Sequence, residues 1–412
     1  MPAIALAGAF LAALALPRWS LGQVEPFDAW VLGVGVAIPL TLAIVGLMAS
    51  VFVPQAYCKY GCPTGALFKF VRSANQAETW GRRDTWAAVV LALGAGVAFL
   101  PRAEYVVEES PETSARRAVT ELHGAAFGTT WTVKVRGSDV DAEILKRELE
   151  AEINRVEFSL SHWRESSATA DFNHLESVQP FGITQELADT TEFALRLSTV
   201  TGGRYDITVA PLTNLWGYGP DGQRPEPTPA QLKAALTRVG WQKLKLDKEN
   251  LTLAKSHEGV NLDLGSVLQG YAADRAAALL RAQGQHDYLI EVGGEILAAG
   301  SWRVGLEDPF NPRLMLQTML LTDRAVSTSG LYRAKKLAGG KPVSHILSPL
   351  TGRPVEPTLE MVAVFHASCF QADGWSTALM AVGFEEAKRI AQSEKLDVIL
   401  VTPDKKVWRS GK

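Results

Sequence analysis

The chain has 412 residues, which is too long for one ordinary domain and predicts two or three. Its 44 acidic and 41 basic residues give a net charge of −3, and no basic run interleaved with aromatic residues supports nucleic-acid binding. Three cysteines, Cys58, Cys62 and Cys369, are too few for the disulfide framework of a small secreted scaffold.

Apolar segments dominate the first 102 residues, whereas the rest of the chain has ordinary globular composition. Phe27–Val53 is nearly continuous apolar sequence, and about 20 such residues suffice to span a bilayer core. Trp86–Leu100 and Pro2–Leu16 are shorter, and we interpret them as two further spans. A cleaved signal peptide is the alternative for the first segment, but no positive charge precedes Arg18. We therefore predict an all-α membrane segment over residues 1–102.

The loop between the second and third predicted spans is rich in positive charge. It holds five basic and two acidic residues, namely Lys59, Lys69, Arg72, Arg82, Arg83, Glu78 and Asp84. The positive-inside rule places such a loop in the cytoplasm. With three spans, residues 103–412 then emerge on the periplasmic face of a bacterial inner membrane.

The same loop contains a cysteine pair. Cys58 and Cys62 are followed by Pro63, and this C-x3-C-P spacing matches the end of the bacterial ferredoxin run. A [4Fe–4S] cluster needs four thiolates, and here there are two. Three interpretations stay open: no cluster, half of an iron–sulfur site completed by a partner or a second copy, or a redox dithiol or other metal site. The loop resembles the membrane iron–sulfur segments of NosR/NapH-type electron-transfer proteins in truncated form.

Beyond a charged, proline-containing linker at 103–118, the patterns predict a mixed α/β (α+β) domain over residues 119–412. His123–Val135 alternates as strand, turn and strand, and Leu244–Ala254 reads as a hairpin. Helical periodicity covers four segments: Asp141–Phe158, Glu186–Thr201 with Gly202-Gly203 at its C-terminal end, Pro229–Val239 and Ala272–Gln283. Between the first two helices, Ser161 and Trp163 belong to a polar, aromatic stretch that forms either a ligand lip or a solvated loop.

Three stretches carry chemistry that fits one site. Paired glycines in Gly293-Gly294-Glu295 follow an apolar strand and allow a bulky, charged ligand to approach the backbone. Asp373 and Thr377 are spaced i, i+4, which places two oxygens on one face of a helix. With Asn261–Ser266 leading into a helix, these features indicate a magnesium–pyrophosphate site. The alternatives are a helix N-cap for Asp373 and a hydroxyl bonded to its own turn for Thr377.

Nine motifs in one order then carry a family resemblance. They are Phe-Gly-Thr-Thr (127–130), Leu-Ser-x-Trp (160–163), Tyr-Asp-x-Thr-Val-x-Pro-Leu (205–212), Asp-Leu-Gly (263–265), Gln-Gly-Tyr-Ala-x-Asp (269–274), Gly-Gly-Glu (293–295), Thr-Ser-Gly-x-Tyr (328–332), His-Ile-x-x-Pro-x-Thr-Gly (345–352) and Ala-Asp-x-Trp-x-Thr-Ala-Leu (372–379). This set is similar to the ApbE-type FAD:protein FMN transferases, in a NosX-like form. The resemblance implies an α/β fold, bound FAD, Mg²⁺, and transfer of FMN to a Thr or Ser of a partner flavoprotein with release of AMP.

The resemblance also implies roles for individual residues. FAD would be bound by Phe127, Gly128, Thr129, Ser161, Trp163, Asn173, Asp206, Thr208, Gln269, Gly270, Asp274, Gly293, Gly294, Glu295, Thr328, Ser329, Gly330 and His345. Mg²⁺ would be held by Asp373, Thr377 and the main-chain carbonyl of Gly265, and catalysis would involve His345, Asp373 and Asp263. Ser348 stands where the family has aspartate, and Gln269 where many relatives have lysine, so the general base stays open.

The resulting hypothesis is a magnesium-dependent FMN transferase, tethered to the lipid bilayer, that modifies a NosR-like respiratory flavoprotein. An FAD pyrophosphatase releasing FMN and AMP is one alternative. A membrane electron-transfer flavoprotein fed by the Cys58–Cys62 loop is another. The segment Ser166–Thr169 echoes the acceptor pattern Asp-x-x-Ser/Thr-x-Ala-Thr, but Trp163 stands in the place of its aspartate, so modification of the chain by itself is not expected.

Overall fold

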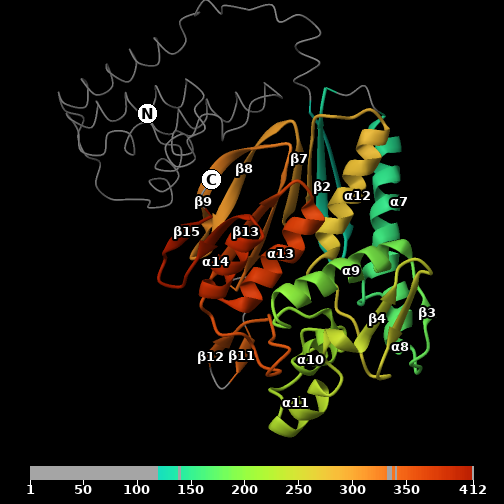
Figure 1. The fold of residues 1–412 in the computed structure, drawn as a ribbon. Coiled ribbons are helices and arrows are strands. Elements are labelled where there is room, and N and C mark those ends of the chain that lie inside the picture. Colours follow the sequence, from blue (N-terminus) through green and yellow to red (C-terminus); the bar gives the residue numbers. More distant parts are fainter. Residues whose placement is uncertain (1–118, 138–140, 332–335, 339–340, 411–412) are drawn as a thin grey trace, which may run out of the picture. The chain divides into compact units, whose positions relative to one another are not determined.

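The computed structural model describes residues 119–137, 141–331, 336–338 and 341–410 (Figure 1). All of them belong to the unit Glu109–Lys412. The predicted membrane spans, the linker at 103–118 and the Cys58–Cys62 loop lie outside the described residues. In the part of the chain that is described, no helix combines the length and apolar character that a membrane span requires.

An eight-stranded antiparallel sheet forms the centre of the domain, in the order β1-β2-β6-β7-β10-β13-β14-β15. Its strands are β1 (Val119–Ala126), β2 (Thr129–Arg136), β6 (Tyr288–Val292), β7 (Glu295–Ala299), β10 (Ala325–Gly330), β13 (Met361–His366), β14 (Asp397–Val401) and β15 (Val407–Arg409). The predicted strand–turn–strand is confirmed as β1–β2. Its turn residues Phe127 and Gly128 have φ of 56° and 71°, a conformation that favours glycine.

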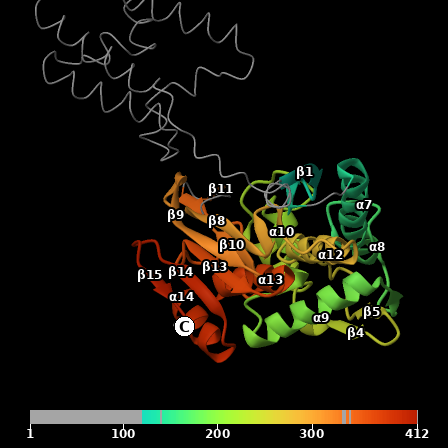
Figure 2. The same ribbon diagram turned by 90° about the horizontal axis from the view of Figure 1, so that it is seen from above.

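Both faces of this sheet are covered, which explains the uninterrupted apolar sequence of β13. Val362 and Val364 pack into the core beneath the helices. Met361, Ala363 and Phe365 pack into a second core beneath the hairpin of β8 (Ser301–Asp308) and β9 (Asn311–Thr322). Figure 2 shows the helices on one side of the sheet and this hairpin on the other. The fold is therefore a mixed α+β layered domain.

Eight helices and two 3₁₀ turns are described beside the strands. The helices are α7 (Ala142–Leu160), α8 (Ala168–His174), α9 (Gln185–Val200), α10 (Ala210–Leu215), α11 (Pro229–Leu236), α12 (Leu268–Ala282), α13 (Cys369–Val382) and α14 (Phe384–Ser393). The 3₁₀ turns are η3 (Ile207–Val209) and η4 (Trp241–Lys243). The remaining strands are β3 (Phe181–Gly182), β4 (Leu244–Asp247) and β5 (Thr252–Lys255) in one small sheet, and β11 (Lys336–Ala338) and β12 (Lys341–Val343) in a hairpin.

Two predicted helix boundaries were wrong. The helix predicted from Ala272 begins at Leu268, so Gln269 and Gly270 lie in its first turn. Its N-cap residue, Val267, offers no side-chain cap, and the Gly270 N–H is instead bonded at 2.9 Å by Asp373 of α13. The helix predicted to reach Val239 ends at Leu236, although its start is fixed by the capping box of Thr228 and Gln231.

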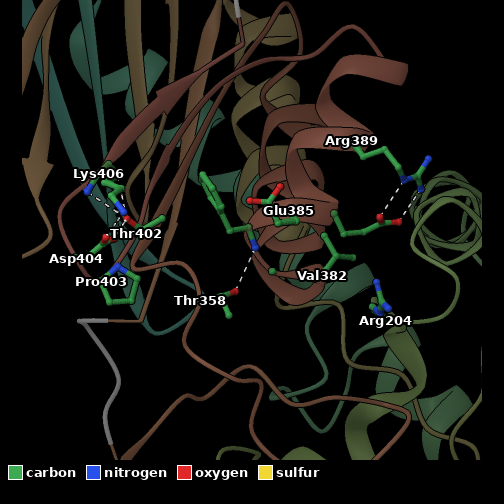
Figure 3. A pocket seen from close by; sticks show the side chains of 12 residues that line it. Arg204, Thr358, Val382, Glu385, Arg389, Thr402, Pro403, Asp404 and Lys406 are labelled. Carbon is green, nitrogen blue, oxygen red and sulfur yellow. Dashed lines mark hydrogen bonds and ion pairs between the residues drawn. The ribbon is translucent and has the colours of Figure 1, made fainter.

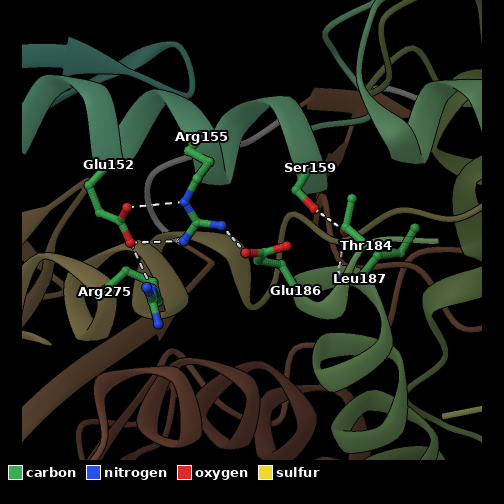
Figure 4. Close-up of polar contacts among 7 residues, drawn as sticks. All are labelled: Glu152, Arg155, Ser159, Thr184, Glu186, Leu187 and Arg275. Atoms are coloured by element: carbon green, nitrogen blue, oxygen red, sulfur yellow. Dashed lines mark hydrogen bonds and ion pairs between the residues drawn. The ribbon is translucent and has the colours of Figure 1, made fainter. Parts of the chain in front are cut away.

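An ion network joins three of the helices (Figure 4). Glu152 of α7 accepts hydrogen bonds from Arg155 at 2.8 Å and from Arg275 of α12 at 2.7 Å. Arg155 also pairs with Glu186 in the first turn of α9. The hydrogen bond from Arg155 is the main cause of the lowered pKa of Glu152. These ion pairs between charged side chains link α7, α9 and α12 and so fix the three helices relative to one another.

Candidate active site

One cavity of about 520 Å³ gathers most of the motifs that the sequence singled out. Its lining comes from α12 and α13, the segment before α12, the β6–β7 turn, the end of β10, and the loops around residues 162, 205, 218 and 345. The predicted site residues that line it are Trp163, Asp206, Asp263, Gly265, Gln269, Gly293, Glu295, Thr328, Ser329, Gly330, His345, Asp373 and Thr377. Segments far apart in the sequence thus meet at one place.

Asp373 and Thr377 project from α13 into this cavity, as their spacing predicted. The N-cap alternative for Asp373 was wrong, because Ser368 caps α13 and Asp373 lies inside the helix. Asp373 is 4% exposed, and burial raises the pKa of its carboxyl to about 8. The Thr377 hydroxyl lies 3.1 Å from the hydroxyl of Ser329 on β10. Two hard oxygens therefore face the same space.

The start of α12 approaches α13 so closely that residue 270 must be glycine. A Cβ atom at Gly270 would lie 2.5 Å from the Cys369 carbonyl oxygen and 2.7 Å from Asp373 Cβ. The close approach lets the Gly270 N–H donate to Asp373 Oδ2. One helix terminus thereby orients the carboxylate, since a helix N-terminus favours a negative charge.

The segment Leu262–Ser266 is held beside the cavity by two side chains that lie outside the cavity, Asn173 and Lys255. Asn173 of α8 donates to the Leu262 carbonyl at 2.9 Å and accepts from the Leu262 N–H at 2.6 Å. Lys255 is 1% exposed, and its Nζ donates to the carbonyls of Phe172 at 3.0 Å and Val260 at 3.2 Å. Burial lowers the pKa of Lys255. These bonds hold the backbone at Asp263 and Gly265 in place.

The paired glycines form the turn between β6 and β7. Gly293 and Gly294 have φ of 65° and 110°, and the Gly294 N–H donates to Glu291 at 2.6 Å. A Cβ atom at Gly293 would lie 3.1 Å from Thr129 and 3.2 Å from Gln269. Both glycines adopt a backbone conformation that favours glycine, and the backbone of Gly293 lines the cavity.

Other predicted residues support the site from outside the cavity. Asp274 accepts from the Ser368 hydroxyl and the N–H groups of Cys369 and Phe370, so it caps α13. Burial raises the pKa of Asp274. Asp206 reaches the cavity, yet its oxygens accept from Thr208 and from the Trp241 N–H. The predicted ligand residues that do not line the cavity are Phe127, Gly128, Thr129, Ser161, Asn173, Thr208, Gly270, Asp274 and Gly294.

Several lining residues were missed. His162 lies between two predicted residues, is 9% exposed, and places Nδ1 3.6 Å from Asp263 Oδ1. Tyr205 bonds Ser266 through their hydroxyls at 2.8 Å, and burial raises the pKa of that phenol. Tyr218 faces His345 edge-on, with ring centroids 6.4 Å apart. His162 and Tyr205 could have been found because they are sequence neighbours of the predicted residues Ser161, Trp163 and Asp206.

The cavity has two unlike walls. We call α13, the start of α12 and the segment 262–266 the buried wall. The open wall comprises Trp163, Arg204, Tyr218 and His345. Trp163 is 57% exposed, and Arg204 is also exposed.

The donor set of the buried wall suits a hard cation. Within the described ranges, no group of three or more His, Cys, Asp or Glu side chains is placed to hold a metal. One carboxylate, one hydroxyl and a nearby main-chain carbonyl are hard oxygens, which Mg²⁺ takes in small number from a protein when phosphates and water complete its shell. The residues present therefore fit magnesium bound together with a phosphate ligand.

Comparison with known proteins gives one consistent result. A model of the ApbE family matches residues 127–400. The FAD:protein FMN transferase of Salmonella typhimurium is 37% identical over 318 residues, which cover 74% of this chain and 91% of the relative. That of Escherichia coli K12 is 33% identical over 332 residues, which cover 76% and 95%.

Solved structures agree with the sequence matches. The flavin transferase ApbE from Vibrio cholerae aligns with a TM-score of 0.64 at 30% identity, covering 71% of this chain and 98% of that one. The apo form of the Pseudomonas stutzeri flavinyl transferase ApbE gives a TM-score of 0.64 at 30% identity, covering 72% and 96%. The matched regions include every segment that lines the cavity.

Proposed function

The chain belongs to the ApbE family and is an FAD:protein FMN transferase, and from this premise we propose which of its residues carry the reaction and which kind of protein accepts the FMN. The pairing of Asp373 and Thr377 on the cavity face of α13 is the observation that carries the assignment. We assign Mg²⁺ to these two side chains and to the carbonyl of Gly265. When bound, the cation would neutralise charge that develops on the pyrophosphate.

The reaction joins a Thr or Ser hydroxyl oxygen of the acceptor to the phosphorus of FMN, and the bond to the AMP oxygen breaks. The hydroxyl proton leaves, and AMP departs with the electrons of the broken bond. The glycine turn at 293–294 offers its backbone to the FAD, and Glu295, Thr328 and Ser329 line the same cavity. His345 lies on the opposite wall, where it can contact the pyrophosphate. Asp263 and Asp373 are the carboxylates that we propose as proton acceptors, since Ser348 carries none.

The acceptor that we propose is a redox flavoprotein of a respiratory membrane complex, of the NosR type. We also propose that the transferase domain is periplasmic and tethered by the first 102 residues, with a truncated NosR/NapH-like segment at Cys58 and Cys62. The apolar segments and loop charges of the sequence support this topology. An iron–sulfur cluster at the cysteine pair is tested by EPR spectroscopy of the purified full-length chain.

The decisive experiment mixes the full-length chain in detergent with FAD, Mg²⁺ and a NosR-type FMN-binding domain. Covalent flavin on the domain and AMP in equal amount are the expected products. Release of FMN without labelled domain would contradict the proposed acceptor. Unchanged Mg²⁺ affinity in Asp373→Ala would contradict the metal assignment.

A further inference from the structure

A second hollow of about 1060 Å³ lies on the surface beside the cavity (Figure 3). It runs between the α13–α14 junction at Val382–Glu386 and the β14–β15 turn at Thr402–Lys406, and Thr358 also lines it. We call it the α14 groove. The Phe384 N–H donates to the Thr358 hydroxyl at 3.2 Å, and a Cβ atom at Gly383 would lie 2.7 Å from that hydroxyl. Thr358 therefore packs closely against the α13–α14 junction.

Most charges along the α14 groove are already paired with each other. Arg389 bonds Glu386 at 2.6 Å, and Lys406 pairs with Asp404 at 2.7 Å. The pKa of Glu386 is lowered chiefly by its bond to Arg389 and least by the field of Arg204. These pairs leave the groove with apolar and hydroxyl surface and little net charge of its own.

Glu385 pairs with Lys388, which does not line the groove. Arg204 is exposed, and among the described residues no carboxylate pairs with it within 4.0 Å, although its charge acts on Glu386. It is also the only Lys or Arg among the described residues that line the FAD cavity. An arginine without a carboxylate partner favours binding of a carboxylate or phosphate.

Arg204 lines both hollows, so the two hollows meet at this residue. They also meet along α13, where Ala381 lines the cavity and the next residue, Val382, lines the α14 groove. Thr377 lies one turn earlier on the same helix, at the proposed metal. Arg204 and the Ala381–Val382 step are therefore the places where a segment lying in the groove would come next to the cavity.

We propose that the α14 groove binds the segment of the acceptor protein that carries the modified hydroxyl, and that Arg204 pairs with an acidic side chain of that segment. The inference rests on the proposed function, since it requires a protein acceptor. The apolar walls of the groove contact the segment, and the pairing at Arg204 sets its register so that the hydroxyl enters the cavity. Arg204 is thus a specificity residue for the acceptor and not for FAD.

The test is a kinetic comparison of the full-length wild-type chain with Arg204→Glu. The probes are a NosR-type FMN-binding domain and a peptide of the pattern Asp-x-x-Thr-x-Ala-Thr. We expect KM for the acceptor to rise at least about tenfold, with KM for FAD changed less than about twofold. Arg147→Glu is the matched control, because Arg147 is exposed on α7 and lines neither hollow. Replacing the acceptor carboxylates one at a time by lysine should restore activity with Arg204→Glu at one position.

Each other outcome is informative. An equal rise in KM for FAD would assign Arg204 to the FAD phosphates and overturn the proposal, as would unchanged kinetics. A change in oligomeric state measured by light scattering would mean that a second copy of the chain fills the groove, which also overturns it. Wild-type chain that modifies the peptide but not the domain contradicts the proposed partner alone, and the Arg204 comparison then proceeds on the peptide.

Discussion

The two walls of the FAD cavity differ in how their side chains are held. On the buried wall, Asp373 is fixed by the start of α12, and the segment at Asp263–Gly265 is anchored through Asn173 and Lys255. On the open wall, Trp163 and Arg204 are exposed to solvent. The difference teaches that the side chains proposed to hold the metal and the phosphate are placed by buried hydrogen bonds, while those proposed to contact the ligand or the partner from outside lie on the surface.

The largest effect should come from removing the charge at the centre of the buried wall. Asp373→Asn keeps the shape of the side chain but not its negative charge, so FMN transfer should fall at least about 100-fold. AMP release measures the loss of FMN transfer, and titration calorimetry measures the loss of Mg²⁺ affinity. Asp171→Asn on the exposed face of α8 is the control. Full activity in Asp373→Asn would contradict the proposal that the reaction takes place at the buried wall.

The same carboxylate should make the stability of the metal-free protein depend on pH. Burial raises the pKa of Asp373 from 3.8 to about 8. Because the folded-state pKa lies above the unfolded one, the stabilisation is complete below the unfolded pKa and is lost as pH rises towards about 8. Urea unfolding should therefore give a lower free energy of unfolding at about pH 8 than at about pH 5.

Asp206 and Asp274 change stability in the same direction, because burial raises both pKa values. The difference between wild type and Asp373→Asn isolates the contribution of Asp373. Added Mg²⁺ should restore stability at high pH in wild type only. If the free energies of unfolding of the two proteins changed with pH in parallel, a raised pKa of Asp373 in the folded protein would be contradicted.

A methyl group at the α12–α13 contact should come next. Gly270→Ala places a Cβ atom against main-chain atoms of Cys369, which cannot move away without shifting α13. We expect a loss of about 3 kcal/mol in the free energy of unfolding, with reduced Mg²⁺ affinity. Gly182→Ala is the control, since a Cβ atom there meets nothing within 4 Å. Equal stability of the two variants would show that the helices adjust freely.

Lys255→Met tests whether the anchor of the 262–266 segment matters for the site. Methionine keeps the apolar stem but leaves buried carbonyls of Phe172 and Val260 without their donor, which costs about 2 kcal/mol. FMN transfer should fall as well, because the Gly265 carbonyl loses its fixed position. Lys245→Met, at an exposed position on β4, should change neither quantity.

The smallest effect is expected on the open wall. Trp163→Ala should leave the free energy of unfolding within about 0.5 kcal/mol of wild type, because the indole is largely exposed. KM for FAD should rise about threefold through loss of an aromatic contact. A loss of stability as large as that of Gly270→Ala would erase the distinction between the two walls.

Much of this architecture was predictable from the sequence. The Phe127-Gly128 turn, the helix ended by Gly202-Gly203, and the i, i+4 pair on α13 all follow from local patterns, and the structure confirms them. The order of the nine motifs also identified the family, because this order can be read from the sequence alone. These signals work since each depends on residues close together in the chain.

What escaped prediction depends on contacts between distant residues. The start of α12 has no local capping residue, because Asp373, more than a hundred positions away, bonds its Gly270 N–H. Asn173 and Asp274 were predicted to bind FAD, yet the structure places their side chains on backbone that supports the cavity. Lys255, a charged residue in a short strand, gave no sign that it would be buried.

The double burial of β13 has a consequence for how the enzyme comes apart. Since its alternate side chains belong to the cores on both faces, neither layer can open without exposing this strand to water. Amides of β13 should therefore exchange hydrogen only through global unfolding. The helix that carries Asp373 starts three residues after β13 ends. A partly unfolded molecule that keeps α13 in place is then not an accessible state, and loss of transferase activity on heating should coincide with loss of the whole fold.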